Sequence, residues 1–315
     1  MDPLAYQLYK DLTQTGLLPP GQRVLVSWSG GPDSTALVRI CQEWQKTLDW
    51  ELTLVHFNHQ IRPESEEEES FCRETAKNLN LPLEVYYPAA PFESTGVQGA
   101  SRLWRRRVLL ERAAEMQCSK IALGHQQNDL AETLLWRMLR GTSLFGLCGL
   151  TLLEEPWFRP LLGLARGDLL AYLNRIGQDW REDPSNESDD YLRNRIRRQL
   201  IPLMSELAGT SAVDKLAKLA GEAEDLQIWF DQTFDPSLWT SPTLDYQSLA
   251  GLVPLFALEL IHRFLLHKGC REIGHRQLEE IFKLAQSGKG GWRIDLKDGL
   301  MVEGRAHLIR VEVAG

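Results

Sequence analysis

The chain has 315 residues, of which 43% are hydrophobic and 25% charged, so it is long enough for two domains and has the composition of an ordinary soluble globular protein. Its net charge of -8 argues against an extended nucleic-acid-binding surface, although "RLWRRR" (102–107) and "RNRIRR" (193–198) are strongly basic. The first ten residues lack a continuous apolar stretch, and "LFGLCGLTLL" (144–153) is too short and glycine-rich to span a bilayer, so we expect a cytoplasmic protein without a membrane segment.

Short apolar runs alternate with helical patterns between residues 23 and 140. Strands are predicted at 23–28, 51–57, 83–87 and 120–124. Helices are predicted at 34–44, 65–79, 97–116 and 130–140, the second opened by a capping box of Ser65 and Glu68. The alternation predicts an α/β fold, a parallel sheet with helices on both faces, in which ligands bind beyond the carboxyl ends of the strands.

The alternation fades after residue 140. A turn-forming cluster, "EDPSN" (182–186), precedes a helix predicted at about 190–203, and the pattern over 211–286 is mainly helical. Residues 291–313 alternate more tightly, with Asp298 and Gly299 as a hairpin turn. We therefore expect an N-terminal domain over residues 1–209 and a smaller, mainly helical C-terminal domain over residues 210–315.

The turn "SGGPDS" (29–34) stands between the first predicted strand and the next helix. Adjacent glycines let backbone N–H groups approach an oxyanion, and the start of a helix adds partial positive charge. The alternative is a purely structural turn with Ser34 as the N-cap. The lysine-containing Walker pattern is absent, and "GKGG" (288–291) lacks its spacing. A loop without lysine favours pyrophosphate held by backbone amides and Mg²⁺, with Asp33 as the candidate metal ligand.

His125 and Asp129 follow the strand predicted at 120–124, so His125 should lie at the ligand-binding edge of the sheet. A histidine there can donate to a phosphate or assist proton transfer. Asp129 is a second candidate Mg²⁺ ligand, but Asp129 and Glu132 could instead form a capping box for the next helix. His56 is interpreted as pocket lining or loop packing.

The two basic clusters contain candidates for an anion contact. Arginine suits a bidentate contact to a carboxylate or a phosphate, and Arg195 is the candidate here. The alternative for both clusters is a solvated helix face.

Six blocks, in order, resemble the tRNA(Ile)-lysidine synthetase family of pyrophosphate-loop ATP pyrophosphatases. They are "SGGPDS", "HFNHQIR" (56–62), "LGHQQNDLAETLLWRMLRG" (123–141), "RPLL" (159–162), "EDPSN" and "RNRIR" (193–197). The resemblance covers about residues 23–202, and beyond them it extends only to the general layout. It implies an adenine nucleotide alpha hydrolase-like fold for the N-terminal domain and a tRNA-binding role for the C-terminal domain.

The family resemblance also implies a reaction. ATP adenylates the wobble cytidine of a tRNA(Ile) with a CAU anticodon, through the oxygen on carbon 2, and releases pyrophosphate. The ε-amine of free L-lysine then displaces AMP to give lysidine, which switches decoding from AUG to AUA. The resemblance thus implies a ligase that forms a C–N bond, with ATP and Mg²⁺ as cofactors, tRNA(Ile) and free L-lysine as partners, and a homodimer.

The resemblance assigns roles to individual residues of these blocks. The implied catalytic residues are Asp33, His125, Asp129 and Arg195. The implied ATP-binding residues are Ser29, Gly30, Gly31, Pro32, Asp33, Ser34 and His56. The implied substrate-binding residues are Arg102, Glu132, Arg193 and Arg197, and the implied Mg²⁺ ligands are Asp33 and Asp129.

The chain departs from the family pattern directly after His125. The family usually has H-H-x-D-D-Q where this chain has His125-Gln126-Gln127-Asn128-Asp129-Leu130. Asn128 cannot supply a charged ligand, and Gln126 cannot act as an acid or a base. A glutamate expected near Gln98 is absent, and Arg106 stands where an aromatic residue is common. We nevertheless expect the adenylating core to remain.

Other functions are considered beside this one. The tRNA thiolation enzymes, which also adenylate a base, rely on cysteine persulfides or C-x-x-C clusters, and the five widely spaced cysteines form no C-x-x-C pair and are expected to be buried. GMP, NAD and asparagine synthetases would add a glutaminase domain or different downstream motifs. A catalytically silent nucleotide- or RNA-binding member would account for the substitutions at Gln126, Asn128 and Leu130, and an α/β scaffold with a structural turn is the remaining alternative.

Overall fold

The computed structural model describes residues 1–60, 64–90, 97–182, 192–271, 273–287 and 291–313. The chain forms two compact units, the first containing Met1–Trp136 and Gly149–Ala220 and the second Arg137–Cys148 and Gly221–Gly315. We expected a domain boundary near Gly209, which ends helix α8 (Ile201–Ala208) in a left-handed conformation. The two compact units instead divide within helix α9 (Ala212–Thr233).

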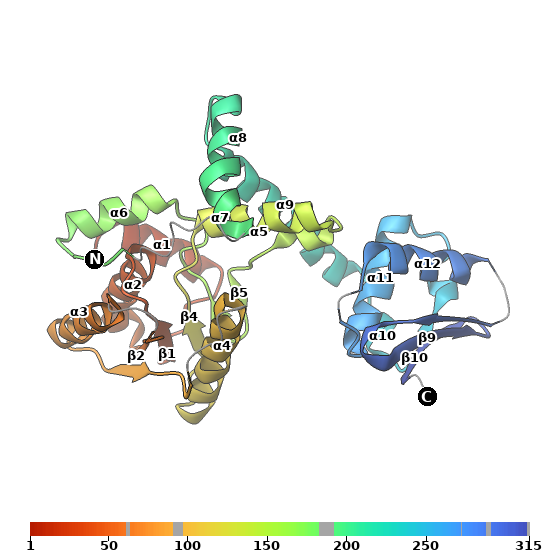
Figure 1. The fold of residues 1–315 in the computed structure, drawn as a ribbon, viewed down its shortest axis with the longest axis horizontal. Coiled ribbons are helices and arrows are strands. Elements are labelled where there is room, and N and C mark those ends of the chain that lie inside the picture. The colour runs from red at the N-terminus through yellow and green to blue at the C-terminus, as the bar shows by residue number, and fades with distance from the viewer. Residues whose placement is uncertain (61–63, 91–96, 183–191, 272, 288–290, 314–315) are drawn as a thin grey trace. The chain divides into compact units, whose positions relative to one another are not determined.

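The described residues of the first unit form a six-stranded sheet (Figure 1). The strand order is β3 (Leu83–Tyr86), β2 (Glu51–Phe57), β1 (Arg23–Ser27), β4 (Lys120–Ala122), β6 (Trp157–Phe158) and β5 (Leu153–Glu154). Neighbouring strands run parallel except β5, which is antiparallel to β6. The predicted parallel sheet is therefore confirmed, with two further short strands, β6 and the edge strand β5, that the sequence pattern did not reveal.

The alternating residues of β1 pack against helices on opposite faces of the sheet. Val24 and Val26 belong to a core that includes residues of α1 (Pro3–Gln14), α2 (Pro32–Leu48), α3 (Glu64–Leu79) and α6 (Arg166–Arg175). Leu25 belongs to a second core with Leu109 and Ala113 of α4 (Val97–Glu115). Because successive side chains of a strand point to opposite faces, this division confirms that helices cover both sides of the sheet.

Several helices begin earlier than the sequence pattern predicts. Helix α2 starts at Pro32, with Gly31 as its N-cap, so Ser34 lies in the first turn and is not the cap. Proline suits this position because the first helical N–H needs no partner within the helix. Helix α3 begins at Glu64, so Ser65 does not cap it either. Helix α5 spans Gln127–Arg140, three residues longer at its start than predicted.

The helix predicted at 190–203 is divided into three parts. The chain forms α7 (Leu192–Arg195), a π-helical turn η3 (Ile196–Leu200) and then α8. π-Helical turns are often found at functional sites, and this one carries Arg197. Residues 183–186 of "EDPSN" lie outside the described residues.

The second unit combines helices with a small sheet. Beside the C-terminal part of α9 it contains α10 (Ser237–Thr240), α11 (Pro254–His267) and α12 (His275–Gln286). Its described strands form an antiparallel sheet in the order β7 (Leu244–Asp245), β10 (Leu308–Val313), β9 (Leu300–Arg305) and β8 (Trp292–Asp295). A mainly helical unit with a hairpin over residues 291–313 was expected, whereas the strands that extend this hairpin to a four-stranded sheet were not.

The second unit contains the hairpin turn that the sequence predicts and a second one that it does not. The hairpin turn expected at 298–299 does join β8 to β9. A second hairpin turns at Ala306 and His307, which both adopt positive φ. Trp292 is buried in the core of this unit, whereas Trp229 is 45% exposed.

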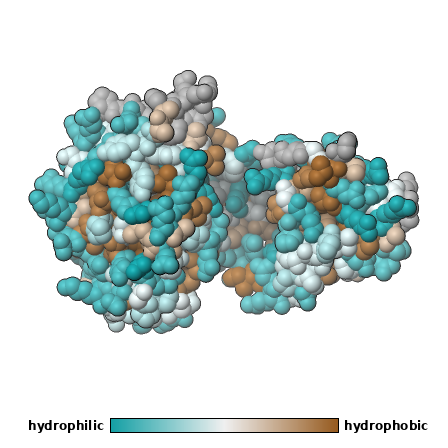
Figure 2. Space-filling view, turned by 90° about the horizontal axis from the view of Figure 1, so that it is seen from below, coloured by the Kyte–Doolittle hydropathy of each residue, from teal (hydrophilic) through white to brown (hydrophobic). Residues whose placement is uncertain are grey.

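The described surface offers no sign of a membrane-spanning helix. Within the ranges given above, none of the helices is both long and apolar enough to cross a bilayer. In the view of Figure 2, small groups of hydrophobic residues are separated by hydrophilic ones. All five cysteines are free, and all but Cys118 are buried, as expected for small hydrophobic residues.

Candidate active site

The turn after β1 closes on itself through two serines. The backbone N–H of Ser29 donates to Oγ of Ser34 over 3.2 Å, and the two hydroxyl oxygens lie 3.0 Å apart. The Ser34 hydroxyl also donates to the carbonyl of Gly31 over 3.1 Å. Gly30 has a φ of 86°, which a residue with a side chain rarely adopts. The result is a tight glycine turn at the start of α2, the geometry that favours anion binding.

His56 supports this turn from behind. Its side chain is only 2% exposed, and Nδ1 donates to the carbonyl of Trp28 over 3.0 Å. Burial lowers the pKa of His56, so the ring is neutral at pH 7. This contact places His56 in the loop-packing role that we considered, while ATP binding by His56 stays a prediction.

The residue before His125 brings two parts of the site into contact. A Cβ on Gly124 would lie 3.0 Å from both N and Cα of Ser34, closer than most Cβ contacts in proteins. The end of β4 therefore packs directly against the first turn of α2. Since β4 pairs with β1 in parallel, the residues after both strands leave the sheet at the same edge.

Three buried polar atoms on residues that follow β1 and β4 lack a hydrogen-bond partner among the described residues. They are Oδ1 of Asp33, Nδ1 of His125 and Nε2 of Gln126. Buried polar atoms are usually satisfied, so such a group is a sign of a missing ligand, water or ion. Asp33 and His125 were both predicted as site residues, whereas Gln126 was not.

The environment of Asp33 suits a cation. The pKa of Asp33 is raised to about 6, chiefly by burial and also by the negative charge of Asp129, while the positive charges of Arg166 and Arg197 and the nearby side-chain amide of Gln126 act in the opposite direction. A metal ion beside Asp33 and Asp129 would stabilise both carboxylates in their charged forms. The described residues hold no group of three or more His, Cys, Asp or Glu side chains suited to a metal. Mg²⁺ commonly takes only one or two carboxylates and completes its shell with phosphate and water, so the two aspartates fit it.

The start of α5 is capped in a way that the sequence did not suggest. The side-chain Oε1 of Gln126 accepts from the backbone N–H of Asn128 over 2.7 Å. Oδ2 of Asp129 accepts from the backbone N–H of Gln126 over 3.0 Å. The proposed capping box of Asp129 and Glu132 was therefore wrong, because the helix starts before Asp129 and Glu132 points into other contacts.

Glu132 is the acceptor for two arginines. Its side chain is 1% exposed, with Oε2 accepting from Nε of Arg193 over 3.1 Å and Oε1 accepting from Nε of Arg197. Nη2 of each arginine also lies 3.5 Å from Oδ1 of Asp129. Residues four apart share a helix face, which explains why Arg193 and Arg197 meet the same carboxylate. Arg195 lies between them in the sequence but is exposed and is not part of this cluster.

Positive charge surrounds His125. The pKa of His125 is lowered to about 4, chiefly by burial, with the charges of Arg159, Arg193 and Arg102 acting in the same direction and the charge of Asp129 opposing them. Burial, followed by the charges of Arg193, Arg106 and Arg159, also lowers the pKa of Arg102. A neutral histidine among arginines is suited to an anion such as a phosphate group.

Comparisons with known proteins agree with this geometry. Residues 4–204 match a family of PP-loop domains. A tRNA(Ile)-lysidine synthase from Thermosynechococcus vestitus is 31% identical over 302 residues, which are 93% of this chain and 87% of that protein. The chain belongs to the tRNA(Ile)-lysidine synthase family. A longer family member, from Symbiobacterium thermophilum, is 35% identical over 227 residues, and the match spans 69% of this chain and 47% of that protein.

A solved structure outside this family shares the fold. The U34-tRNA thiolase NcsA from Methanococcus maripaludis, with its [4Fe-4S] cluster, superimposes with a TM-score of 0.59. The superposition covers 73% of this chain and 79% of the thiolase, at 13% sequence identity. At this identity the likeness concerns the fold alone.

Sequence reasoning missed several arginines at the same edge. Arg159 has a side chain that is 4% exposed; it donates to the carbonyl of Thr151 over 2.9 Å and to Glu154 over 3.0 Å. Its buried Nε has no partner among the described residues. Arg166 opens α6, and its charge has the largest effect on the pKa of Asp33 after burial. These residues follow β6, whose two residues gave no recognisable strand pattern, so their place at the sheet edge was not foreseen.

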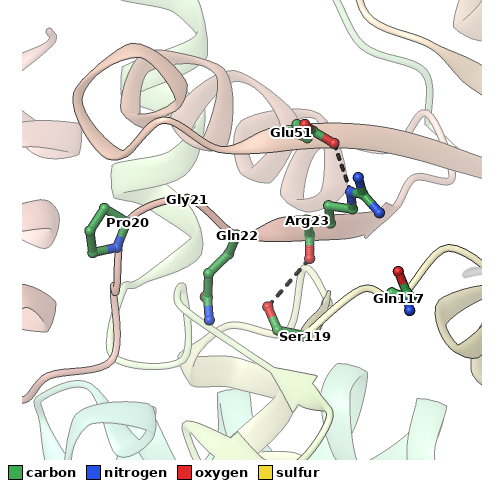
Figure 3. Close-up of a pocket in the computed structure, with 7 residues that line it drawn as sticks. All are labelled: Pro20, Gly21, Gln22, Arg23, Glu51, Gln117 and Ser119. Carbon is green, nitrogen blue, oxygen red and sulfur yellow. Dashed lines mark hydrogen bonds and ion pairs between the residues drawn. The ribbon is translucent and has the colours of Figure 1, made fainter.

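A pocket of about 500 Å³ lies at the opposite edge of the sheet (Figure 3). It is lined by Pro20, Gly21, Gln22, Arg23, Glu51, Gln117 and Ser119. Nε of Arg23 donates to Glu51 over 2.8 Å, and both residues begin their strands. The pocket contains none of the predicted site residues, in keeping with ligand binding at the carboxyl edge.

We predict that Gly124→Ala weakens Mg-ATP binding. The added Cβ would push against the backbone of Ser34 and displace the first turn of α2, at a stability cost of roughly 1–3 kcal/mol. Calorimetric titration with Mg-ATP and thermal unfolding measure the two effects. Gly167→Ala is the matched control, because a Cβ there meets nothing within 4 Å. Equal behaviour of the two variants would contradict the close approach.

We predict that Glu132→Gln lowers the free energy of unfolding by about 2 kcal/mol. The change leaves two arginines without their shared carboxylate; their 37% and 30% exposure keeps the cost below that of a fully buried pair. Chemical denaturation measures it. Glu111→Gln, which removes the partner of exposed Arg107, should change stability by less than about 0.5 kcal/mol. A Glu132 variant as stable as this control would refute the cluster's role.

We predict that His125 stays neutral down to about pH 5. Its pKa in the folded chain lies below the value of about 6.5 in an unfolded chain, so acid favours the unfolded state. Stability that is present above pH 6.5 is therefore lost as the pH falls towards 4, by roughly 1–2 kcal/mol between pH 7 and 5. His125→Gln should remove this part of the acid sensitivity in denaturation curves. An imidazole signal of His125 that titrates near pH 6.5 would contradict it.

Proposed function

We propose that this protein is a tRNA(Ile)-lysidine synthetase. It joins free L-lysine to carbon 2 of the wobble cytidine in tRNA(Ile) with a CAU anticodon, using ATP and releasing AMP and pyrophosphate. The observation that carries the proposal is the trio of unpartnered buried atoms on Asp33, His125 and Gln126 beside a lysine-free glycine turn. Membership of the family supports the choice of substrate, because the relatives are themselves tRNA(Ile)-lysidine synthases.

The first step transfers AMP from ATP to the cytidine oxygen. Negative charge grows on the departing pyrophosphate, so fixed donors at that position lower the barrier. The backbone N–H groups of Gly30, Asp33 and Ser34, the last two in the first turn of α2, can supply such donors. Asp33 and Asp129 would hold Mg²⁺, which would offset phosphate charge. His125 and its neighbouring arginines suit the phosphate that remains on the cytidine.

The second step is attack by the amine of lysine on carbon 2. The amine must be uncharged to attack, so a proton acceptor is required. Neutral His125 has an unpartnered Nδ1, which can accept that proton or donate to the AMP phosphate, depending on the tautomer. We assign substrate binding to Arg102, Arg193 and Arg197, with Glu132 fixing the last two in place. Arg195, exposed beside this cluster, stays a candidate for contact with tRNA or a phosphate.

The remaining parts of the proposal concern partners and location. We assign ATP chemistry to residues 1–209 and tRNA binding to residues 210–315. The family resemblance supports a homodimer, and a tRNA substrate supports a cytoplasmic location. Trp229 is exposed in the second unit and is a side chain on which a base could stack.

We predict that the purified protein attaches labelled lysine to a tRNA(Ile) transcript with a CAU anticodon in the presence of Mg-ATP. A transcript with a changed wobble base is the control and should receive no label, because the reacting oxygen belongs to cytidine. Retention of label on the tRNA is measured by acid precipitation. Asp33→Asn should reduce the rate at least about a hundredfold, as loss of a positioned charge at a reacting phosphate typically does.

Other outcomes of this assay lead to different conclusions. Tight binding of both nucleotide and tRNA without label would favour the silent member of the family. Label on both transcripts would show ligation that does not depend on the wobble cytidine. ATP–pyrophosphate exchange without label would retain the adenylating step and reject lysine as the acceptor.

A further inference from the structure

The glycine turn lacks the lysine that most phosphate loops use, but a distant residue reaches it. The backbone N–H of Arg181 donates to the carbonyl of Gly30 over 2.9 Å. The carbonyl oxygen of Arg181 lies 3.9 Å from where a Cβ on Gly31 would be. The segment that follows α6 is therefore attached to the turn through both glycines.

The side chain of Arg181 is held beside the same turn. Its Cζ lies 4.4 Å from the ring centroid of Phe71, a distance typical of cation–π stacking. Phe71 is 8% exposed, and its Cδ1 lies 3.7 Å from the position of a Cβ on Gly30. The ring of Phe71 therefore lies buried between the Arg181 guanidinium and Gly30, and this packing restricts its movement.

Most donors of this guanidinium are available. Nη1 of Arg181 donates to the carbonyl of Trp180 over 3.3 Å. The described residues provide no carboxylate partner for Arg181, in contrast to Arg193 and Arg197, which share Glu132. The side chain is exposed, so a ligand in the turn can approach it. A stacked arginine whose described neighbours include no carboxylate partner is already oriented for two parallel hydrogen bonds to phosphate oxygens.

We propose that Arg181 binds the β- and γ-phosphates of ATP, and the pyrophosphate that they become, and so supplies the cation that the turn lacks. The backbone contact with Gly30 fixes the distance between this cation and the N–H groups of the turn. The stack on Phe71 restricts the side chain before the ligand arrives, which reduces the entropy lost on binding. The inference rests on the proposed function only in assuming that ATP is cleaved to AMP and pyrophosphate.

The test compares ligands that do and do not carry the two outer phosphates. Binding of Mg-ATP, Mg-pyrophosphate and AMP to the full chain is measured by calorimetric titration, without tRNA or lysine. Arg181→Ala should weaken Mg-ATP and Mg-pyrophosphate by about tenfold, the usual effect of losing a charged hydrogen-bond donor. AMP binding should change less than about twofold, because alanine keeps the backbone N–H that contacts Gly30. Arg181→Lys should show a smaller loss for both outer-phosphate ligands.

The matched control removes Arg23, an arginine at the opposite edge of the same sheet. Arg23→Ala changes the net charge equally, at the amino end of β1, where Arg23 pairs with Glu51 (Figure 3). It should leave all three affinities unchanged. An Arg181→Ala variant that binds like Arg23→Ala would overturn the proposal. An equal loss for AMP and ATP would also overturn it, because it would show a general effect on the shape of the turn.

The same titrations separate this inference from the ligase proposal. A protein that binds ATP and shows the selective effect of Arg181, but adds no lysine to tRNA, would keep the inference and reject the ligase. A wild-type protein that binds neither ATP nor pyrophosphate would overturn both. The outcome for Arg181 therefore does not depend on the identity of the acceptor.

Discussion

The central position of β1 is the constraint on which the site depends. This strand is hydrogen-bonded in parallel to β2 on one side and β4 on the other, with Leu25 opposite both Thr53 and Ile121. The chain must therefore leave β1 and β4 at the same edge of the sheet. Gly124 allows the two exits to come into backbone contact, and a larger residue would separate them. His125 and the start of α5 follow from that contact, as do the two aspartates that suit Mg²⁺.

Features determined by neighbouring residues could be predicted from the sequence. The two glycines after an apolar run identify the turn at 29–34, and the position of His125 follows from the strand before it. Contacts between residues far apart in the chain could not be predicted. Arg181 meets Gly30 only because α6 packs along α2, and β6 is too short to show a pattern of its own. Arg159 follows that strand and was missed for the same reason, although its block had been noticed.

The errors at helix ends have a physical origin as well. Glutamine is not among the preferred N-cap residues, so the sequence favoured Asp129 as the cap of α5. The side chain of Gln126 performs this function instead, and Glu132 is released to accept from Arg193 and Arg197. In the second unit, Ala306 and His307 form a turn with positive φ, for which glycine or asparagine is the usual signal. These two errors occurred where an uncommon residue took a common role.

The loss of a carboxylate at Asn128 does not by itself argue for a silent protein. Asn128 lies in the capped first turn of α5, where its backbone N–H donates to Gln126. Two carboxylates, on Asp33 and Asp129, still influence each other, and Mg²⁺ needs no more than that when phosphates complete its shell. Glu132 is balanced by two arginines, while the charges of Arg102 and Arg159 also act on His125. A neutral residue at position 128 therefore leaves this edge of the sheet richer in positive charge. That charge favours the binding of a ligand with several phosphates over the binding of an uncharged ligand.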